Sequence, residues 1–214
     1  ALPEIDEADI DTSCRFLGRK LSAPLMISAM TVGHPSVKEI NVNLALAASE
    51  LGIAMGVGSQ RAALEEESLK DTFSAVRDAA PDIPIIGNIG AVQLKRSGPG
   101  ILDQLAEMID ADAIAVHLNF LQESIQPEGD RDASGGVKVL GEAANGSVPI
   151  IVKETGAGIS RETAASLADV GVKMIDVSGQ GGLSWAGVET YRAAEIGDCD
   201  LEEMGRLFWS WGIP

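Results

Sequence analysis

Residues 113 to 123 read Ala-Ile-Ala-Val-His-Leu-Asn-Phe-Leu-Gln-Glu, a short apolar run that ends abruptly in polar side chains. The apolar part follows a helix-like segment, which is typical of a parallel strand covered on both faces. A ring, two amides and a carboxylate come at and just beyond its carboxyl end, where α/β folds place ligands. A solvated turn would explain any one of them, but together they favour a site. These four residues are His117, Asn119, Gln122 and Glu123.

The same succession of an apolar run, a polar or Gly-rich break and an amphipathic helix recurs along the chain from Ala23 onward. This succession is the βα unit. The predicted strands are residues 24–30, 53–58, 84–89, 113–118, 149–153 and 174–178. The predicted helices are residues 37–51, 66–80, 100–110, 137–145, 160–170 and 184–196.

Helix-forming signals support two of these segments in detail. In the first helix, one buried face is predicted from a spacing of three and four residues. Its members are Val37, Ile40, Leu44, Ala47, Ala48 and Leu51. In the fifth, Ser160 is a good N-cap, Glu162 lies in the first turn, and Gly171 closes the helix.

Six consecutive βα units allow either a doubly wound sheet or part of an eight-stranded barrel. The barrel is favoured because nearly every predicted strand ends in site-like residues, whereas a doubly wound sheet concentrates them at one switch point. A closed barrel needs eight strands and about 250 residues. We therefore predict a TIM (β/α)8 barrel of which about six βα units are present, in one partial domain over residues 1–214.

Composition excludes several classes of protein. The chain of 214 residues is 45% hydrophobic, so a globular core is expected. It has no run of 18 apolar residues and no basic and apolar leader, so we expect neither a membrane span nor a secretory signal, and a cytoplasmic location. Cys14 and Cys199 are far apart, which suggests neither a disulfide framework nor a zinc site.

The charge balance is strongly acidic. Asp and Glu number 32 against 16 Lys and Arg, for a net charge of −16. Nucleic acid is therefore excluded as a partner. Acidic positions on helix-like segments indicate solvated outer faces. Such acidic surfaces are typical of proteins from salt-loving microbes, and ordinary acidic variation is the alternative.

Several strand ends carry groups able to bind a flat polar ring or a phosphate. The segments 30–33 and 56–61 combine glycine turns with hydroxyls and with Arg61, which could hold a diphosphate or form a surface ion pair. Asn88 can both donate and accept, as pyrimidine-like rings require. Lys153 ends a buried run, so either Glu154 pairs with it or it faces an electron-rich cofactor.

Two further features concern ions and protons. Glu123 could give one oxygen to a Mg²⁺ ion whose other ligands are waters and phosphate oxygens. The segment 178–185, Ser-Gly-Gln-Gly-Gly-Leu-Ser-Trp, is a phosphate-loop candidate or a plain glycine turn. Glu189, one helical turn beyond Trp185, could serve as a second acid or base, but an exposed helix carboxylate is the simpler interpretation.

Taken in order, these segments resemble type 2 isopentenyl-diphosphate isomerase, the flavin-dependent form. The resemblance rests on Ala-Pro-Leu-Met-Ile-Ser-Ala-Met-Thr, Gly-Val-Gly-Ser-Gln-Arg, Gly-Asn-Ile-Gly-Ala, His-Leu-Asn-Phe-Leu-Gln-Glu, Val-Lys-Glu-Thr-Gly and Gly-Gly-Leu-Ser-Trp-Ala. It implies a barrel that binds FMN and Mg²⁺, uses NADPH to reduce the flavin, and converts isopentenyl diphosphate to dimethylallyl diphosphate. A homo-oligomer is also expected.

The resemblance also implies roles for individual residues. The FMN contacts would be Ala29, Met30, Thr31, Ser59, Asn88 and Lys153. The substrate contacts would be Ser59, Gln60, Arg61, His117, Asn119 and Gln122. The Mg²⁺ ligand would be Glu123, and the catalytic groups would be Gln122, His117 and Lys153.

Two residues depart from the family's pattern, Val32 in place of a glycine and Leu183 in place of a threonine. Two other functions remain as alternatives. An FMN-dependent 2-hydroxy-acid oxidase of the same barrel superfamily would need a His base and an Arg pair late in the barrel. An inactive fragment would serve only as a binding or assembly piece.

Overall fold

The computed structural model describes residues 4–31, 33–182 and 184–212. The chain divides into two compact units, which are described separately. The first is Ala1–Gly87 with Met108–Asp112, and the second is Asn88–Glu107 with Ala113–Pro214. The boundary runs through strand β5 and helix α5, so each contributes to both units. The assignment of residues 1–214 to one domain stays a prediction.

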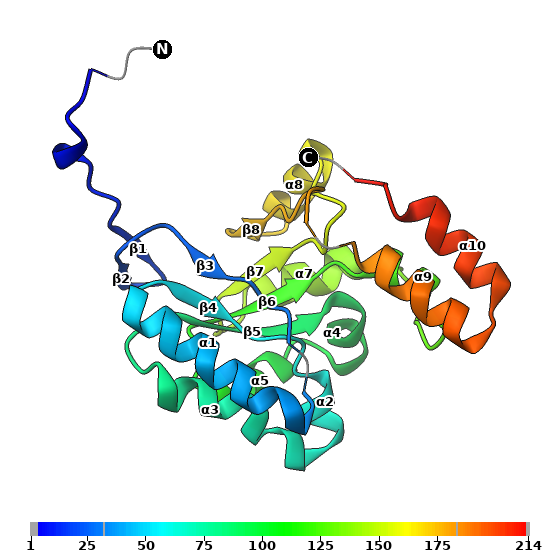
Figure 1. The fold of residues 1–214 in the computed structure, drawn as a ribbon. Coiled ribbons are helices and arrows are strands. Elements are labelled where there is room, and N and C mark those ends of the chain that lie inside the picture. Colours follow the sequence, from blue (N-terminus) through cyan, green and yellow to red (C-terminus); the bar gives the residue numbers. More distant parts are fainter. Residues whose placement is uncertain (1–3, 32, 183, 213–214) are drawn as a thin grey trace. The chain divides into compact units, whose positions relative to one another are not determined.

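The first unit contains three parallel strands in the order β3-β4-β5 and a separate antiparallel hairpin, β1-β2 (Figure 1). Met26 pairs with Ala54 and Met55 with Ile85, which fixes the register. The elements are η1 (Glu7–Asp9), β1 (Cys14–Phe16), β2 (Arg19–Leu21), β3 (Met26–Ile27), η2 (Pro35–Val37), α1 (Lys38–Leu51), β4 (Ala54–Gly56), α2 (Arg61–Glu65), η3 (Glu67–Leu69), α3 (Asp71–Ala79) and the start of β5 (Ile85–Gly90).

The core of the first unit lies between its strands and the neighbouring helices α1 and α3 (Figure 1). Phe73, Val76 and Met55 are almost fully buried there, and Ala45 and Ala48 on α1 are fully buried. Small residues on α1 let the helix approach the strands closely. Burial of this apolar surface is the main stabilising contribution to the unit.

The buried face of α1 differs from the predicted one. Ile40 and Leu51 are 48% and 61% exposed, whereas Asn41 is fully buried. The side chain of Asn41 donates to the carbonyl of Thr72 at 2.8 Å and accepts from the hydroxyl of Thr31. These hydrogen bonds fix the rotation of the helix, and periodicity of apolar residues alone does not detect them.

The second unit continues with the end of β5 and three parallel strands in the order β6-β7-β8 (Figure 1). His117 pairs in register with Lys153, and Lys153 with Asp176. The remaining elements are α4 (Ala91–Ser97), α5 (Ile101–Ile109), β6 (Ala113–His117), α6 (Phe120–Ile125), α7 (Gly136–Ala144), β7 (Ile150–Lys153), α8 (Arg161–Asp169), β8 (Ile175–Asp176), α9 (Trp185–Ile196) and α10 (Cys199–Phe208).

All six predicted strands are present, but β3 and β8 have only two residues each. Among the described strands, β3 pairs only with β4 and β8 only with β7, so each lacks a second ladder of hydrogen bonds to extend it. Six predicted helices are also present. The predicted helix 66–80 is divided into η3 and α3, and helices α2, α4, α6 and α10 were not predicted. Among the described helices, none is long and apolar enough to cross a membrane.

The predicted caps of α8 are confirmed. The hydroxyl of Ser160 accepts a hydrogen bond from the Thr163 N–H at 3.2 Å, as an N-cap residue should. Gly171 follows the helix with φ of 96°, a conformation that glycine adopts with little strain. Both ends of α8 are therefore set by local sequence.

A half-buried network of ion pairs around Asp112 holds the first unit together. Its carboxylate lies 2.7 Å from Arg19 Nε and 2.8 Å from Arg77 Nη2, and it accepts from the Ile85 N–H at 2.9 Å. Burial alone would raise the pKa of Asp112, but these donors outweigh it and hold the pKa below its usual value. Arg77 also donates to the carbonyls of Ala80, Ile83 and Asp110.

We expect Asp112→Asn to lower the free energy of unfolding by about 3 kcal/mol at pH 7, since it leaves two guanidinium groups without their charge partner. The depressed pKa stabilises the folded state above the unfolded-state pKa of about 4, and this contribution is lost as the pH falls through the folded-state value. Denaturant unfolding at pH 7 and below pH 4 should therefore show the difference between the two proteins shrinking in acid. The control is Asp110→Asn, because that carboxylate is 84% exposed and 3.6 Å from Arg77. A loss as large as that of Asp112→Asn would contradict the assignment.

Candidate functional site

The predicted site residues are distributed over both compact units. The first unit carries Ala29, Met30, Thr31, Ser59, Gln60 and Arg61. The second carries Asn88, His117, Asn119, Gln122, Glu123 and Lys153. Each group lies at or just after the carboxyl end of a parallel strand, as expected for an α/β fold.

The loop after β3 lies close to the end of β4. A Cβ at Gly56 would come 3.3 Å from the Cβ of Ala29, so glycine at this position permits the close approach. Met30 is 46% exposed. The hydroxyl of Thr31 donates to Asn41, which leaves its oxygen lone pairs as acceptors.

The three residues after β4 have different environments. Ser59 is half-buried, but Gln60 is fully buried and its Nε2 donates to Met108 Sδ at 3.4 Å. Arg61 begins α2 and lies 4.0 Å from Glu65, a long and exposed ion pair that holds the guanidinium weakly. Ser59 and Arg61 are therefore better placed to meet a ligand than Gln60, whose substrate role stays a prediction.

In the second unit the ends of β5 and β6 meet through Asn88 and His117. Asn88 Oδ1 lies 2.7 Å from His117 Nδ1, and Asn88 is only 3% exposed. An amide oxygen cannot donate, so Nδ1 carries the proton in this bond. A neutral His117 then has Nε2 as its proton acceptor, the form needed for general base chemistry.

Glu123, on α6, is a buried carboxylate that is 3% exposed. Its Oε1 accepts from Asn119 Nδ2 at 2.7 Å and from Gln93 Nε2 at 3.0 Å, and its Oε2 accepts from the Asp130 N–H at 2.8 Å. Asn119 Oδ1 is buried beside this group and has no hydrogen-bond partner among the described residues. Such an acceptor is costly unless water, an ion or a ligand satisfies it.

Gln122 faces a second buried carboxylate. Its Nε2 donates to Glu189 Oε1 at 3.0 Å, and Glu189 is 2% exposed. The exposed position that was the simpler interpretation for Glu189 is therefore wrong. The sequence could not show this, because the helices α6 and α9 that bury it meet only in the tertiary structure.

Arg192 balances the charge of Glu189. Its guanidinium lies 2.7 Å from Glu189 Oε2 and 2.7 Å from Glu128 Oε1. The two carboxylates raise the pKa of Arg192 above its usual value, Glu128 through the strongest hydrogen bond. Glu189 is therefore a paired buried anion whose other oxygen fixes the orientation of the Gln122 amide.

Lys153 ends β7 and is 8% exposed. Its Nζ donates to the main-chain oxygen of Glu154 at 2.9 Å, while the Glu154 carboxylate accepts from the N–H groups of Thr155 and Ala157. Burial lowers the pKa of Lys153, and the nearby charges of Asp176 and Glu154 oppose this shift. Among the described residues no ion pair joins Lys153 to the Glu154 carboxylate, and the cofactor role of Lys153 stays a prediction.

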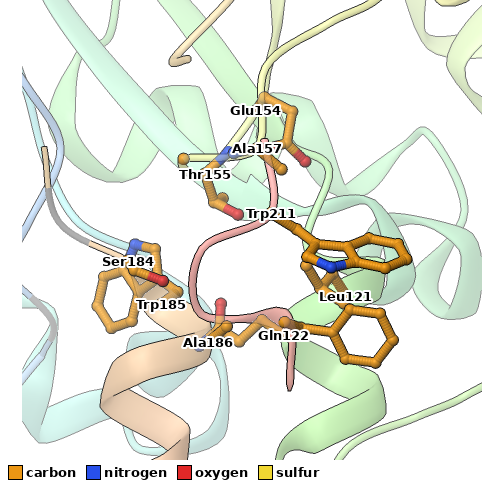
Figure 2. Close-up of a pocket in the computed structure, with 11 residues that line it drawn as sticks. Leu121, Gln122, Glu154, Thr155, Ala157, Ser184, Trp185, Ala186 and Trp211 are labelled. Atoms are coloured by element: carbon orange, nitrogen blue, oxygen red, sulfur yellow. The ribbon is translucent and has the colours of Figure 1, made fainter. Parts of the chain in front are cut away.

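A small open pocket in the second unit is lined by both polar and aromatic side chains (Figure 2). Its lining residues are Leu121, Gln122, Glu154, Thr155, Gly156, Ala157, Ser184, Trp185, Ala186, Phe208 and Trp211. Trp185 and Trp211 lie on different sides of the pocket. Its aromatic side chains suit an apolar group, and its polar side chains can orient that group. Gln122 therefore borders both this pocket and the buried carboxylate Glu189.

The glycine-rich segment before α9 is built as a turn. Ser178 has a φ of 35° and its N–H donates to Asp176 at 3.1 Å, and Gln180 donates to the Ser210 carbonyl at 2.7 Å. Ser184 caps α9 by accepting from the Gly187 N–H. Both departures from the family pattern, Val32 and Leu183, lie outside the described residues.

Four residues of this arrangement were missed by sequence reasoning: Gln93, Glu128, Asp130 and Arg192. Gln93 follows the Asn88 segment on α4, but nothing local marks it as a partner of Glu123. In the described part of the chain, no three His, Cys, Asp or Glu side chains group to hold a metal ion. Any ion at Glu123 would take most of its ligands from water or from a bound phosphate.

The fold is that of α/β barrels. Residues 4–78 match the family model described as FMN-dependent dehydrogenase. A mandelate oxidase mutant with a flavin adduct matches 90% of this chain and 63% of its own, with a TM-score of 0.51 and 15% identity. The aldolase QR15 matches 73% of this chain and 69% of its own chain, with a TM-score of 0.52 and 13% identity. These two likenesses confirm the predicted barrel class.

Among curated proteins the similarity is to isopentenyl-diphosphate delta-isomerases. The protein of that name from Methanothrix thermoacetophila is 64% identical over all 214 residues. Those from Archaeoglobus fulgidus and Halobacterium salinarum are each 54% identical over the full chain. The chain spans about 60% of the length of these relatives. The resemblance stated from the sequence is thus confirmed over the whole of this chain.

We expect Asn88→Ala to weaken FMN binding at least tenfold while lowering the free energy of unfolding by only about 1 kcal/mol, since the apolar residues of its strand supply most of the packing. Flavin titration and urea unfolding measure the two effects. The control is Asn145→Ala, because that exposed amide bonds only the Gly141 carbonyl in the described structure. An unchanged FMN affinity with a large loss of stability would contradict the role of Asn88.

Proposed function

We propose that the protein carrying this chain isomerises isopentenyl diphosphate to dimethylallyl diphosphate with FMN, Mg²⁺ and NADPH as reductant. The observation that carries the proposal is the 52–64% identity, over the full chain, to archaeal isopentenyl-diphosphate delta-isomerases. The site geometry supports it, because polar and charged groups able to serve a diphosphate, an ion and a proton transfer follow successive strands. A homo-oligomer and a cytoplasmic location stay predictions.

Mg²⁺ fits the residues around Glu123. The ion prefers hard oxygen ligands and few carboxylates, and retains several waters. Among the described residues Glu123 Oε2 accepts one hydrogen bond, which leaves a lone pair for an ion, and the buried Asn119 Oδ1 has no donor there. Glu123 would hold Mg²⁺, which would supply positive charge to the diphosphate of the substrate. Arg61, in the first unit, stays a predicted substrate contact.

FMN fits the strand ends that carry Asn88 and Lys153. When bound, the reduced flavin supplies acid–base chemistry at its ring nitrogen. Asn88 would hold polar atoms of the ring, and the buried ammonium of Lys153 would stabilise negative charge on it. Ala29, Met30, Thr31 and Ser59 complete the proposed set of flavin contacts. The exposed loop after β3 offers main-chain groups, and the Thr31 oxygen offers an acceptor.

Isomerisation requires one proton to be added to a carbon and another removed from a carbon nearby. His117 in its Nδ1–H form and the Gln122 amide would orient the substrate beside the reacting carbons. The Gln122 amide does not titrate, so its role is to position. The carboxylate of Glu189 accepts from this amide and holds it in place. Trp185, Phe208 and Trp211 would offer apolar surface to the hydrocarbon part of the substrate.

The alternative functions have less support. An FMN-dependent 2-hydroxy-acid oxidase would need a His base with an Arg pair late in the barrel, whereas His117 is followed by Asn119, Gln122 and Glu123, which suit Mg²⁺-diphosphate better. The mandelate oxidase likeness, at 15% identity, concerns the fold alone. A binding or assembly piece without chemistry would not require four buried ionisable or amide side chains at strand ends.

The proposal is tested by supplying isopentenyl diphosphate to the purified protein and following dimethylallyl diphosphate. Turnover should require FMN, a reductant such as NADPH, and Mg²⁺, each omitted in turn. Reduction of the flavin by dithionite should replace NADPH, because the flavin and not the nicotinamide does the chemistry. Undiminished turnover without flavin would overturn the proposal.

A second test concerns Glu123. We expect Glu123→Gln to raise the half-saturating Mg²⁺ concentration at least tenfold and cost a few kcal/mol of transition-state stabilisation, with FMN affinity nearly unchanged, because the amide keeps the shape but loses the charge. Glu202→Gln is the control, since that carboxylate pairs only with Arg206 on the same helix in the described structure. If Glu123 serves only the fold, stability falls and the Mg²⁺ titration does not move.

A further inference from the structure

Gln93 shares the buried carboxylate of Glu123 with Asn119. Gln93 lies in the first turn of α4 and is half-buried, and its Nε2 donates to Glu123 Oε1 at 3.0 Å. Asn119 Nδ2 donates to the same oxygen at 2.7 Å. A carboxylate oxygen has two lone pairs, so both lone pairs of Oε1 are occupied. From the part of the chain that the structure describes, Oε2 accepts only the Asp130 N–H, which leaves one lone pair.

Gly90 provides the space for this arrangement. Its φ of −74° and ψ of 147° are open to any residue, so glycine is not needed for the backbone conformation. A Cβ there would lie 1.9 Å from Gln93 Oε1 and 3.1 Å from Asn119 Oδ1. The missing side chain therefore lets both amides turn their N–H groups toward Glu123. Their two oxygens lie side by side above Gly90.

The third donor to Glu123, the N–H of Asp130, is fixed by contacts of its own segment. Asp130 lies in the segment between α6 and α7, where Asp132 N–H donates to its carboxylate at 3.0 Å. Lys95, two residues after Gln93, donates to the Asp132 carbonyl at 3.0 Å. A Cβ at Gly129 would lie 1.8 Å from the Glu123 carbonyl oxygen, so this segment packs tightly on α6. Glu123 thus has little freedom to rotate.

We propose that Gln93 is a positioning residue that leaves Glu123 a single oxygen, Oε2, for a cation and thereby favours Mg²⁺ over Ca²⁺. Mg²⁺ accepts one oxygen of a carboxylate and keeps its waters, whereas Ca²⁺ gains from chelation by both oxygens. Because Gln93 and Asn119 fill Oε1, chelation is blocked. The unpartnered, buried Asn119 Oδ1 is an independent sign that a hydrated ion belongs here. The inference rests on the proposed role of Glu123 as the Mg²⁺ ligand.

The test compares Gln93→Met, which keeps the length of the side chain and removes the donor, with Gln126→Met. Gln126 is 8% exposed and donates to Glu128 at 2.6 Å, so the control loses a similar amide–carboxylate bond that does not involve Glu123. Mn²⁺ binding to the FMN-loaded proteins is followed by the electron paramagnetic resonance of free Mn²⁺. Mg²⁺ and Ca²⁺ then displace the Mn²⁺, which yields both dissociation constants without any turnover.

The preference for Mg²⁺ over Ca²⁺ should fall on the order of tenfold in Gln93→Met and stay at the parent value in Gln126→Met. Gly90→Ala should give the same fall by displacing the Gln93 amide, while Gly100→Ala should not, because a Cβ at Gly100 meets no atom within 4 Å. The comparison of Gly90→Ala with Gly100→Ala tests the role of Gln93 if Gln93→Met fails to fold. An unchanged preference in both Gln93→Met and Gly90→Ala would overturn the proposal.

The variant Glu123→Gln distinguishes a failure of the proposed Mg²⁺ role of Glu123 from a failure of the proposed role of Gln93. If this variant binds Mn²⁺ as the parent does, the proposed Mg²⁺ role of Glu123 fails, and the role of Gln93 fails with it. If Glu123→Gln loses Mn²⁺ binding while Gln93→Met keeps the parent preference, only the role of Gln93 fails. We expect Glu123→Gln to lose Mn²⁺ binding and Gln93→Met to lose its preference for Mg²⁺ over Ca²⁺.

Discussion

A carboxylate removed from water must find hydrogen-bond donors or a counter-charge, and this constraint organises both compact units. In the first unit, Asp112 gathers two guanidinium groups and a strand N–H, and so ties the hairpin, α3 and β5 to one point. In the second, Glu123 and Glu189 gather donors from four different segments. Because leaving such a group unpaired costs several kcal/mol, few rearrangements of these segments are tolerated.

The two kinds of buried carboxylate differ in what remains on their oxygens. Asp112 has donors on both oxygens, and two of its partners carry full positive charge, which suits a structural role. Glu123 is surrounded by neutral amides and a main-chain N–H, so its negative charge is hydrogen-bonded but not neutralised. A cation can supply the missing charge. This contrast is the physical reason for assigning the first carboxylate to stability and the second to function.

The chemistry of the proposed reaction also explains the mixture of side chains. The substrate has a highly charged end and a hydrocarbon end, so charge on one side and apolar walls on the other are both required. In the second unit, Glu123 is the carboxylate proposed to hold an ion at the charged end, and the pocket lined by Trp185, Phe208 and Trp211 offers apolar surface. Gln122 borders this pocket and is fixed by Glu189, whose charge Arg192 balances.

The sequence by itself determined the six βα units, the caps of α8 and the polar residues that end each strand. These features are local: alternation of apolar runs with amphipathic helices, a serine before a helix and a glycine after it are visible within a few residues. Asn88, His117, Glu123 and Lys153 could be selected as site residues for the same reason. The flavin and substrate roles of individual residues came from the family resemblance and stay predictions.

Only the tertiary structure decided which polar groups meet. Gln122 and Glu189 are 67 residues apart, and Gln93 and Glu123 are 30 apart, so no local pattern could pair them. The buried face of α1 was misjudged because Asn41 is held inside by hydrogen bonds to residues outside the helix. The amide of Gln60 is likewise held inside by a residue that is distant in the sequence, because its Nε2 donates to Met108 Sδ. Periodicity reports where apolar surface can be buried, whereas hydrogen-bond partners from distant segments decide where polar groups lie.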